Sequence, residues 1–208
     1  MPFDIPGAMT QLGVPSLSKG KLFSTGQGPG LTLIRSGMSA GFVGDCVLWL
    51  QETPCEQIIF LGTCGLITPG PELAIGTVVT PGVIFPFESF SALLTENNPL
   101  PEPLTVTDPL IQDMSLVGPR CVCVSFPSLH EEERFRPVFH TLKAEVIDME
   151  SHAFFIAARR IQRPAAALLV ISDVVGVKTF CFDLSPDDKK SLANGISQAC
   201  TIIKNFSI

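Results

Sequence analysis

The sequence predicts an α/β fold in which helices cover both faces of a central sheet. Ala165–Ile171 is a run of seven apolar residues between Pro164 and the polar pair Ser172-Asp173, the pattern of a strand buried on both faces. Residues 149–161 read as a helix, because apolar residues recur there at helical spacing: Ala153, Phe154, Ile156, Ala157 and Ile161. A hydrophobic content of 46% against 16% charged residues fits a sheet covered in this way.

Length and charge narrow the class of protein. The 208 residues are expected to form a single domain over residues 1–208, large enough for a complete core. A net charge of -6 and a pI near 5.0 argue against nucleic acid and against an anionic membrane surface as partners. No apolar run approaches the roughly 18–20 residues of a membrane span. The N-terminus has no basic region followed by an apolar core, so we expect a cytoplasmic protein.

The seven cysteines are scattered along the chain rather than paired. There is no C-x-x-C motif, and the three histidines show no metal-ligand spacing beside the cysteines. Cys121 and Cys123 alternate with valines along an expected strand, which is typical of small core residues. The sequence therefore predicts no disulfide framework and no cofactor, with metal binding only a minor alternative.

Glu150 follows a short apolar strand and opens the helix of residues 149–161. Asp148 suits the N-cap, because its side chain can accept hydrogen bonds from the first free backbone N–H groups. Glu150 then falls in the first turn, where the positive end of the helix stabilises a carboxylate. Taken alone, Glu150 is better explained as an exposed residue suited to the helix dipole. A charge between a buried strand and a buried helix face, however, needs a partner or a ligand.

Asp173 comes directly after the apolar strand of residues 165–171. In open α/β sheets, ligands bind outside the carboxyl ends of the strands. Taken alone, Asp173 is better explained as a turn or N-cap residue. Glu150 and Asp173 follow successive strands, however, so we expect both at one rim of the sheet. Two carboxylates delivered to one rim are what acid-assisted bond cleavage needs.

The rest of the chain supplies further elements. Strands are expected at residues 3–6, 21–24, 31–35, 57–61, 75–80 and 121–125, and helices after Ser39, at 108–116 and at 186–205. Ser39 can cap its helix, which would turn Phe42, Val43, Cys46, Val47 and Leu50 to the core. Gly62–Gly65 is expected as a junction, either one that lets backbone approach a ligand or a plain tight turn. Phe126–Arg136 suits a lid or a helix over the site, or a solvated helix face.

Five segments occur in the order and spacing of the nucleoside phosphorylase/nucleosidase superfamily: Gly7–Met9, Ser36–Met38, Gly62–Gly65 with Ile75–Val79, Asp148–Glu150, and Ile171–Asp173. In particular, the chain resembles 5′-methylthioadenosine/S-adenosylhomocysteine nucleosidases and futalosine hydrolases. The resemblance covers nearly the whole chain, and the Met-Glu and Ser-Asp pairs are its specific part. It implies a three-layer α/β/α sandwich with a central mixed, partly closed β-sheet, and usually a homodimer.

The resemblance also implies roles for individual residues. Glu150 would bind the ribose hydroxyls and stabilise the cationic sugar, with Met149 packed against the ribose. Asp173 would protonate the five-membered ring of the purine, and Ser172 would orient it. Further substrate-binding positions are implied at Met9, Met38, Cys64, Gly65 and either Phe126 or Leu129.

The implied reaction is hydrolysis of a purine nucleoside, with water as the acceptor. The substrate would be of the 5′-methylthioadenosine, S-adenosylhomocysteine or aminodeoxyfutalosine type. Two alternatives stay open. A phosphorylase of the same fold should carry a basic phosphate cradle, for which only Arg35 is suitably placed. A catalytically weakened nucleoside-binding protein is the other alternative.

One departure from the family pattern supports that second alternative. The nucleosidases carry a water-activating glutamate three residues after the first methionine, whereas Met9 is followed by Thr10-Gln11-Leu12. Glu88 and Glu131 are the nearest substitutes by sequence context. General-base assistance is typically worth ~100–10,000-fold, so its loss would slow cleavage without abolishing it. On this reasoning, Leu12→Glu is expected to raise the rate.

Overall fold

The apolar run that follows Pro164 forms the strand that the sequence predicts. The computed structural model describes residues 4–87, 89, 101–107, 110, 118–178 and 183–206. In it, β9 (Ala165–Val174) is buried at every position except Val174, which is half-buried. β9 pairs with two strands. β4 (Ile58–Leu66) is parallel to it, and β5 (Val78–Pro86) is antiparallel to it. Burial of both faces explains why every residue of this strand is apolar until Ser172.

The main sheet is mixed and closes on itself. Its order is β6-β5-β7-β8-β4-β9, and β5 also pairs with β9, so that five strands form a barrel. β7 (Arg120–Ser125) and β8 (Val146–Asp148) lie side by side and parallel in that barrel. The two-residue strand β6 (Leu104–Thr105) pairs only with β5, outside the barrel. The expected mixed, partly closed sheet is therefore confirmed.

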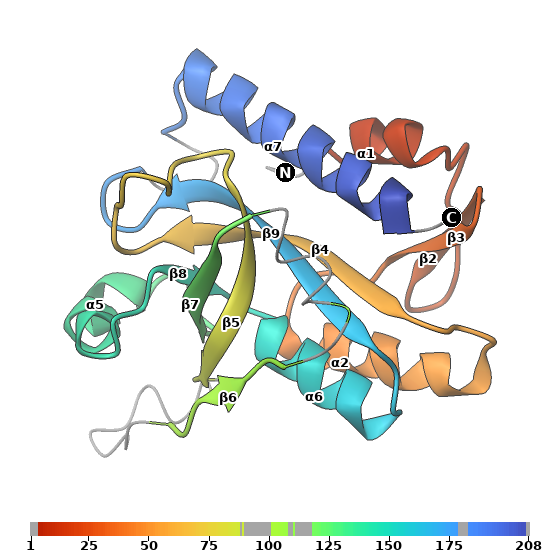
Figure 1. Ribbon diagram of the computed structural model, residues 1–208, viewed down its shortest axis with the longest axis horizontal. Helices are drawn as coiled ribbons and strands as arrows, with labels where there is room; N and C mark the ends of the chain where they lie inside the picture. The colour runs from red at the N-terminus through yellow and green to blue at the C-terminus, as the bar shows by residue number, and fades with distance from the viewer. Residues whose placement is uncertain are drawn as a thin grey trace.

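Helices cover the sheet on two sides (Figure 1). α7 (Pro186–Phe206) and α1 (Ile5–Leu12) lie together on one side, and α2 (Ala40–Trp49) and α6 (Ser151–Arg160) lie together on the other. α5 (Glu132–Thr141) stands at the end of the barrel. The α/β class with three layers is confirmed. Among the described residues, no helix is both long and apolar enough to cross a membrane.

A second, smaller sheet precedes α2. β1 (Ser18–Lys19), β2 (Ser24–Gly28) and β3 (Leu31–Arg35) are antiparallel to one another. The β2–β3 turn contains Gly30 at φ 68°, a conformation that glycine adopts without steric cost. The strand at 31–35 is confirmed, whereas the one expected at 21–24 begins only at Ser24. A 3-10 turn at Leu50–Glu52 extends α2.

The N-terminal segment differs from the sequence-based expectation. Residues 5–12 form α1, so the first strand expected at 3–6 was wrong for the residues described. The carboxylate of Asp4 accepts a hydrogen bond from Gly7 N at 3.0 Å, Pro6 lies in the first turn, and Gly13 ends the helix at φ 70°. An acidic N-cap, an early proline and a terminal glycine are strong helix boundary signals, and here they outweigh the short apolar pattern.

Two other expectations concern connections. Gly62–Gly65 is not a junction, because it lies inside β4, where β8 and β9 supply backbone partners on both sides. The helix expected at 108–116 lies outside the described residues, apart from Leu110. β7, α6 and α7 occur close to where they were expected, although Phe42 and Ile156 are 50% and 45% exposed rather than buried.

Phenylalanine supplies the aromatic packing, since the chain has 15 Phe, one Trp and no Tyr. One apolar cluster fills the barrel and the helix layers. A second lies beneath α5, where Phe126 and Phe139 pack edge to face with ring centroids 5.1 Å apart. Val175, just after β9, belongs to this second cluster. The second cluster therefore packs α5 against the segment that follows β9.

Candidate active site

Glu150 lies where β8 passes into α6, and it occupies the N-cap position. It is half-buried, and its Oε1 accepts a hydrogen bond from the backbone N of Ser39 at 2.7 Å. Ser39 is the residue just before α2, and α2 lies beside α6 in the same layer. Glu150 is therefore not an exposed residue that interacts only with its own helix.

Asp148 is not the N-cap residue, contrary to expectation: it ends β8, Glu150 takes the N-cap position instead of the first turn, and Asp148 binds the start of α6 from inside the protein. It is 4% exposed, and its Oδ2 accepts from Ser151 N at 2.7 Å and from Glu150 N at 3.3 Å. Its Oδ1 accepts from the Ser151 hydroxyl at 2.9 Å. Because Asp148 binds the N–H group of Ser151 at the start of α6, the carboxylate of Glu150 is left to accept from Ser39.

The backbone at Ser39 is strained. Ser39 has φ 117°, and Gly37, two residues earlier, has φ 93°. A non-glycine residue in this region of φ costs of order 1–3 kcal/mol and is held only by its surroundings. The side chain of Ser39 does not cap α2, contrary to expectation; its backbone N–H is the group that the strain directs at Glu150.

Asp173 lies near the carboxyl end of β9 and is 5% exposed. The hydroxyl of Ser172 donates to Asp173 Oδ1 at 2.5 Å and also lies 3.2 Å from the carbonyl oxygen of Cys64. Gly65 pairs with Asp173 across the sheet, and a Cβ on Gly65 would stand 3.1 Å from Asp173 Oδ2. The structure therefore brings four of the expected site residues together: Asp173, Ser172, Cys64 and Gly65.

Burial favours the protonated form of both carboxyl groups. It raises the pKa of Glu150 to about 7, with the charge of Asp148 as a second cause and the N–H groups of Ser39 and Met149 opposing. Burial also raises the pKa of Asp173, and the Ser172 hydroxyl opposes that shift. No lysine or arginine of the described residues forms an ion pair with either group. Perturbed carboxyl groups at a strand end are typical of catalytic sites.

The other expected substrate-binding residues lie at varied depths. Met149 is half-buried between Asp148 and Glu150, and Met38 is 60% exposed beside Ser39. Met9 lies on α1, where it packs against the larger apolar cluster. Phe126 has no exposed surface because Phe87, Phe135 and Phe139 surround it. Of the two positions considered for a contact with the base, only Leu129 reaches solvent, at 48% exposure.

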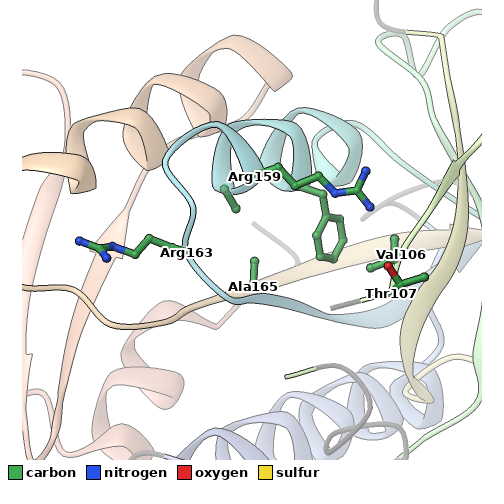
Figure 2. A pocket seen from close by; sticks show the side chains of 7 residues that line it. Val106, Thr107, Arg159, Arg163 and Ala165 are labelled. Atoms are coloured by element: carbon green, nitrogen blue, oxygen red, sulfur yellow. The ribbon is translucent and has the colours of Figure 1, made fainter. Parts of the chain in front are cut away.

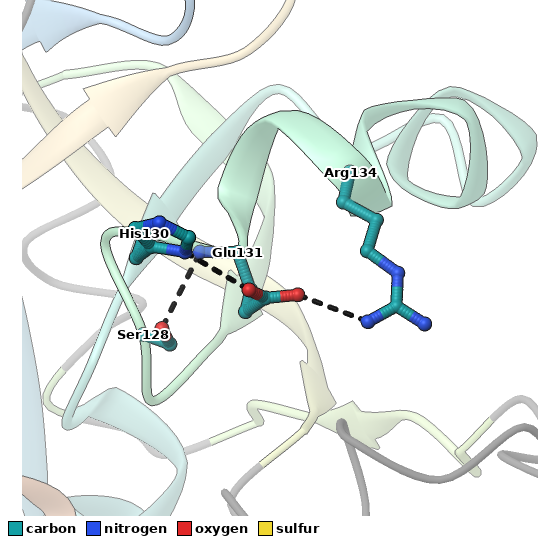
Figure 3. A network of polar contacts seen from close by, with 4 residues as sticks. All are labelled: Ser128, His130, Glu131 and Arg134. Atoms are coloured by element: carbon teal, nitrogen blue, oxygen red, sulfur yellow. Dashed lines mark hydrogen bonds and ion pairs between the residues drawn. The ribbon is translucent and has the colours of Figure 1, made fainter.

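Of the two candidates for water activation, the structure describes Glu131, which forms a network with local residues. Glu131 accepts from Arg134 Nη1 at 3.1 Å and lies 2.9 Å from His130 Nδ1, while its own N–H donates to Ser128 (Figure 3). These partners lower the pKa of Glu131 and hold it in a local network on α5. Glu88 lies outside the described residues.

Leu12 is a buried residue of α1. Leu12 is 3% exposed within the larger apolar cluster. A charge placed there would lose its hydration without gaining a partner. We therefore expect Leu12→Glu to destabilise the fold, and the gain in rate from that substitution stays a prediction.

Glu132 is the residue that sequence reasoning missed. It is half-buried in the first turn of α5, and the charge of Asp173 acts on it. Burial, followed by that charge, raises the pKa of Glu132 to about 8. In the sequence, the three consecutive glutamates at 131–133 were interpreted together as a solvated helix face. The signal that could have separated them is helical phase, since neighbouring residues of a helix point in different directions.

A cavity of about 210 Å³ lies at the other end of β9, beside Ala165 (Figure 2). Arg159 and Arg163 line it, but their guanidinium groups point apart, and Arg159 donates to the carbonyl oxygen of Thr105 at 2.7 Å. Since Ala165 and Asp173 stand at opposite ends of one strand, this cavity is separate from the carboxyl groups.

Comparison with known proteins agrees with the geometry. The family model described as the phosphorylase superfamily matches residues 10–206. The chain belongs to the phosphorylase superfamily. No curated protein sequence matches it. The resemblance inferred from the sequence is confirmed at the level of this superfamily.

Solved structures of the superfamily share the fold at low sequence identity. The 5′-methylthioadenosine/S-adenosylhomocysteine nucleosidase of Helicobacter pylori is 15% identical with a TM-score of 0.74, over 97% of this chain and 93% of that one. Uridine phosphorylase of Vibrio fischeri is 16% identical with a TM-score of 0.75, over 97% and 85%. A futalosine hydrolase mutant of Helicobacter pylori is 14% identical with a TM-score of 0.68, over 97% and 92%. This superfamily member therefore has the fold of enzymes that act on nucleosides, both nucleosidases and phosphorylases.

Proposed function

We propose that the protein hydrolyses the N-ribosidic bond of a purine nucleoside and releases the free base and the sugar. The substrate class is that of 5′-methylthioadenosine, S-adenosylhomocysteine or aminodeoxyfutalosine. The observation that carries this proposal is the placement of Glu150 just after β8 and of Asp173 near the carboxyl end of β9, two strands of one barrel, with different hydrogen-bond partners. Cleavage of a ribosyl C–N bond builds positive charge on the sugar and negative charge on the base, and this site offers a group for each.

On the sugar side, Glu150 acts as a carboxylate. Its oxygens accept hydrogen bonds from the ribose hydroxyls, and its charge stabilises the ribosyl cation in a site poor in water. The N–H of Ser39 supports this role, because a backbone amide can only donate and so favours the ionised form. Met149 and Met38 flank Glu150 and Ser39 along the chain, and we assign them to the apolar surface around the sugar.

On the base side, Asp173 acts as an acid. A hydroxyl carries a single hydrogen, so when Ser172 donates to the carbonyl oxygen of Cys64, its oxygen can accept from protonated Asp173. This chain orients the proton-bearing carboxyl toward the base, which takes the proton as the C–N bond breaks. The electron pair of that bond stays with the base nitrogen. Leu129, rather than the buried Phe126, is the better candidate for contact with the base, and Met9 is a weaker candidate for the sugar.

Water is the proposed acceptor. A desolvated phosphate dianion needs several N–H donors or cationic groups. Arg35, the only suitably placed cation that the sequence offers, lies on β3 in the small sheet. The second candidate function is a phosphorylase, which the similarity to uridine phosphorylase favours. A protein that binds nucleosides without turnover is a third, supported by the lack of a glutamate at position 12.

We also propose that the protein is a cytoplasmic homodimer. The exposed face of α2 carries Phe42 and Trp49, seven residues apart and 50% and 64% exposed. Ile156, on the adjacent helix α6, is 45% exposed. Apolar groups gathered on neighbouring helices suit an interface between copies of the chain.

The test is a panel of 5′-modified adenine nucleosides, assayed for release of free base with and without phosphate. We expect turnover that is insensitive to phosphate and yields free sugar, and loss of turnover in Asp173→Asn. Strict dependence on phosphate, with a phosphorylated sugar as product, would replace the hydrolase by the phosphorylase. Binding of adenine or a nucleoside without turnover would establish the third candidate.

A further inference from the structure

The pairing of β4 with β9 is interrupted next to the candidate acid. Cys64 of β4 pairs with Ile171 of β9. The next residue of β4, Gly65, pairs with Asp173, so that one step along β4 corresponds to two steps along β9. Ser172 is the extra residue, and it forms a one-residue β-bulge. Bulges are rare in parallel pairs, and next to active sites they change the direction of a side chain.

The bulge explains a contact that a regular strand does not allow. Successive side chains of a regular strand point to opposite faces of the sheet. Ser172 and Asp173 are successive residues, yet the Ser172 hydroxyl donates to Asp173 Oδ1 at 2.5 Å. The same hydroxyl lies 3.2 Å from the carbonyl oxygen of Cys64, at the point where the ladder is interrupted. The extra residue therefore brings a hydroxyl and a carboxyl group together.

Gly65 lies opposite that carboxyl group. Cross-strand partners share a face of the sheet, so a side chain at position 65 would point into the same space as Asp173. A Cβ on Gly65 would stand 3.1 Å from Asp173 Oδ2, 3.0 Å from Ile147 Cγ2 and 3.3 Å from Val175 Cγ2. All three distances are shorter than an ordinary van der Waals contact. The φ of Gly65 lies outside the left-handed region, so space rather than backbone conformation requires a glycine here.

We propose that Gly65 is a positioning residue, which leaves the room in which the bulge holds the carboxyl group of Asp173 against the hydroxyl of Ser172. This role rests on the proposed function, because Gly65 acts through Asp173, the proposed acid. A group that transfers a proton must lie within about 2.6–3.2 Å of the atom that receives it. A side chain at position 65 would move the carboxyl group away from that geometry.

Gly62 of the same strand offers a matched control. A Cβ on Gly62 would stand 3.1 Å and 3.2 Å from two ring atoms of Phe60 and 3.3 Å from Cδ2 of Leu169, its cross-strand partner. The crowding is as tight as at Gly65, but it involves only apolar groups. Alanine at either position therefore imposes a similar steric cost, and only alanine at position 65 presses on the acid.

The first experiment measures kcat and KM of Gly65→Ala and Gly62→Ala with the best nucleoside of the panel. We expect Gly65→Ala to lower kcat by about 10-fold with little change in KM, because the methyl group displaces the carboxyl group. Gly62→Ala should keep the wild-type kcat, although both variants should lose melting temperature to a similar extent. Equal kcat in the two variants would overturn the proposal. A rise in KM at unchanged kcat would indicate direct contact between position 65 and the substrate, and it would overturn the positioning role too.

The second experiment repeats the Gly65→Ala substitution in the Asp173→Asn background. Asparagine has the size of aspartate, so the crowding remains while the acidic proton is absent. If Gly65 acts through the acid, Gly65→Ala should lower kcat in this background by roughly 2-fold or less. A structural effect would lower kcat by the same factor in both backgrounds, and that result would overturn the proposal.

The third experiment needs no substrate, and it compares crystal structures of the wild type and Gly65→Ala. We expect the Asp173 carboxyl group to move by a few tenths of an ångström relative to Ser172, while β4 and β9 keep their pairing. A carboxyl group that stays in place, with Ile147 and Val175 displaced instead, would overturn the proposal.

The failures of the two proposals are distinguishable. If the protein releases base but the two substitutions act independently, the positioning role is overturned and the nucleosidase function stands. If the wild type releases no base from any nucleoside of the panel, the proposed function fails and the role in catalysis fails with it. The crystal structures still show in that case whether Gly65 makes room for Asp173.

Discussion

Glu150 follows β8 and Asp173 lies near the carboxyl end of β9, two strands of one barrel with β4 between them, yet the protein surrounds the two carboxyl groups differently. Glu150 faces a backbone N–H, which can only donate and therefore supports a negative charge. Asp173 faces a hydroxyl, which can accept as well as donate and is therefore compatible with a bound proton. Burial raises the pKa of both groups. The comparison teaches that burial makes a carboxyl group unusual, whereas its partners decide whether it serves as a charge or as an acid.

The largest effect is expected from removing the acid. Asp173→Asn keeps the shape and the bond from Ser172 but carries no acidic proton, so kcat should fall by about 100-fold or more. Binding and melting temperature should change little by comparison. Steady-state kinetics with the best nucleoside of the panel checks this, and near-normal turnover would remove Asp173 from the mechanism.

A comparable but smaller loss is expected from removing the charge. Glu150→Gln can still accept from Ser39 and from ribose hydroxyls, but it no longer stabilises the cationic sugar, so kcat should fall by roughly 100-fold with little change in KM.

Glu150→Gln also tests whether Glu150 contributes to folding rather than to catalysis. Its pKa is raised to about 7, so the wild type loses stability as pH rises from 4.5 to 7. Glu150→Gln should therefore gain melting temperature relative to the wild type over that range. A variant that unfolds, or that loses only affinity, would instead favour a structural role.

The pH dependence of kcat/KM should show both carboxyl environments in one curve. Activity should rise as Glu150 ionises near pH 7 and fall at higher pH as Asp173, whose pKa burial raises, loses its proton. The result is a bell-shaped profile whose acid limb lies near pH 7. Glu150→Gln should lose the acid limb alone. A profile that is flat from pH 6 to 9 would contradict both assignments.

The smallest effect is expected at the strained backbone. Ser39→Gly keeps the N–H that binds Glu150 and removes the steric cost of φ 117°. The relief is offset in part by the greater freedom of glycine in the unfolded chain, which leaves a net stabilisation of about 1 kcal/mol. The melting temperature should rise by about 2–4 °C. The acid limb near pH 7 should stay in place, and its displacement would show that more than the N–H of Ser39 supports the charge.

Local patterns were enough to predict much of this protein from its sequence. The apolar run before Ser172 and Asp173 predicts a fully buried strand, because only pairing on both edges and packing on both faces can hide it. The helical spacing after Glu150 predicts α6, and the alternation at Cys121 and Cys123 predicts core positions, which are 3% and 0% exposed. Each of these patterns lies within a single strand or helix, so it can be recognised from the sequence without knowledge of distant contacts.

Contacts between distant segments were decided only by the tertiary structure. Ser39 and Glu150 are 111 residues apart, and the N–H that joins them is common to every non-proline residue, so no sequence pattern marks it. The phase of α5 separates Glu132 from Glu131 and Glu133, and that phase depends on how Phe126, Phe139 and Val175 pack. Hydrophobic periodicity is a property of the chain itself, whereas the direction of a donor and the field of a distant charge exist only once the segments have packed together.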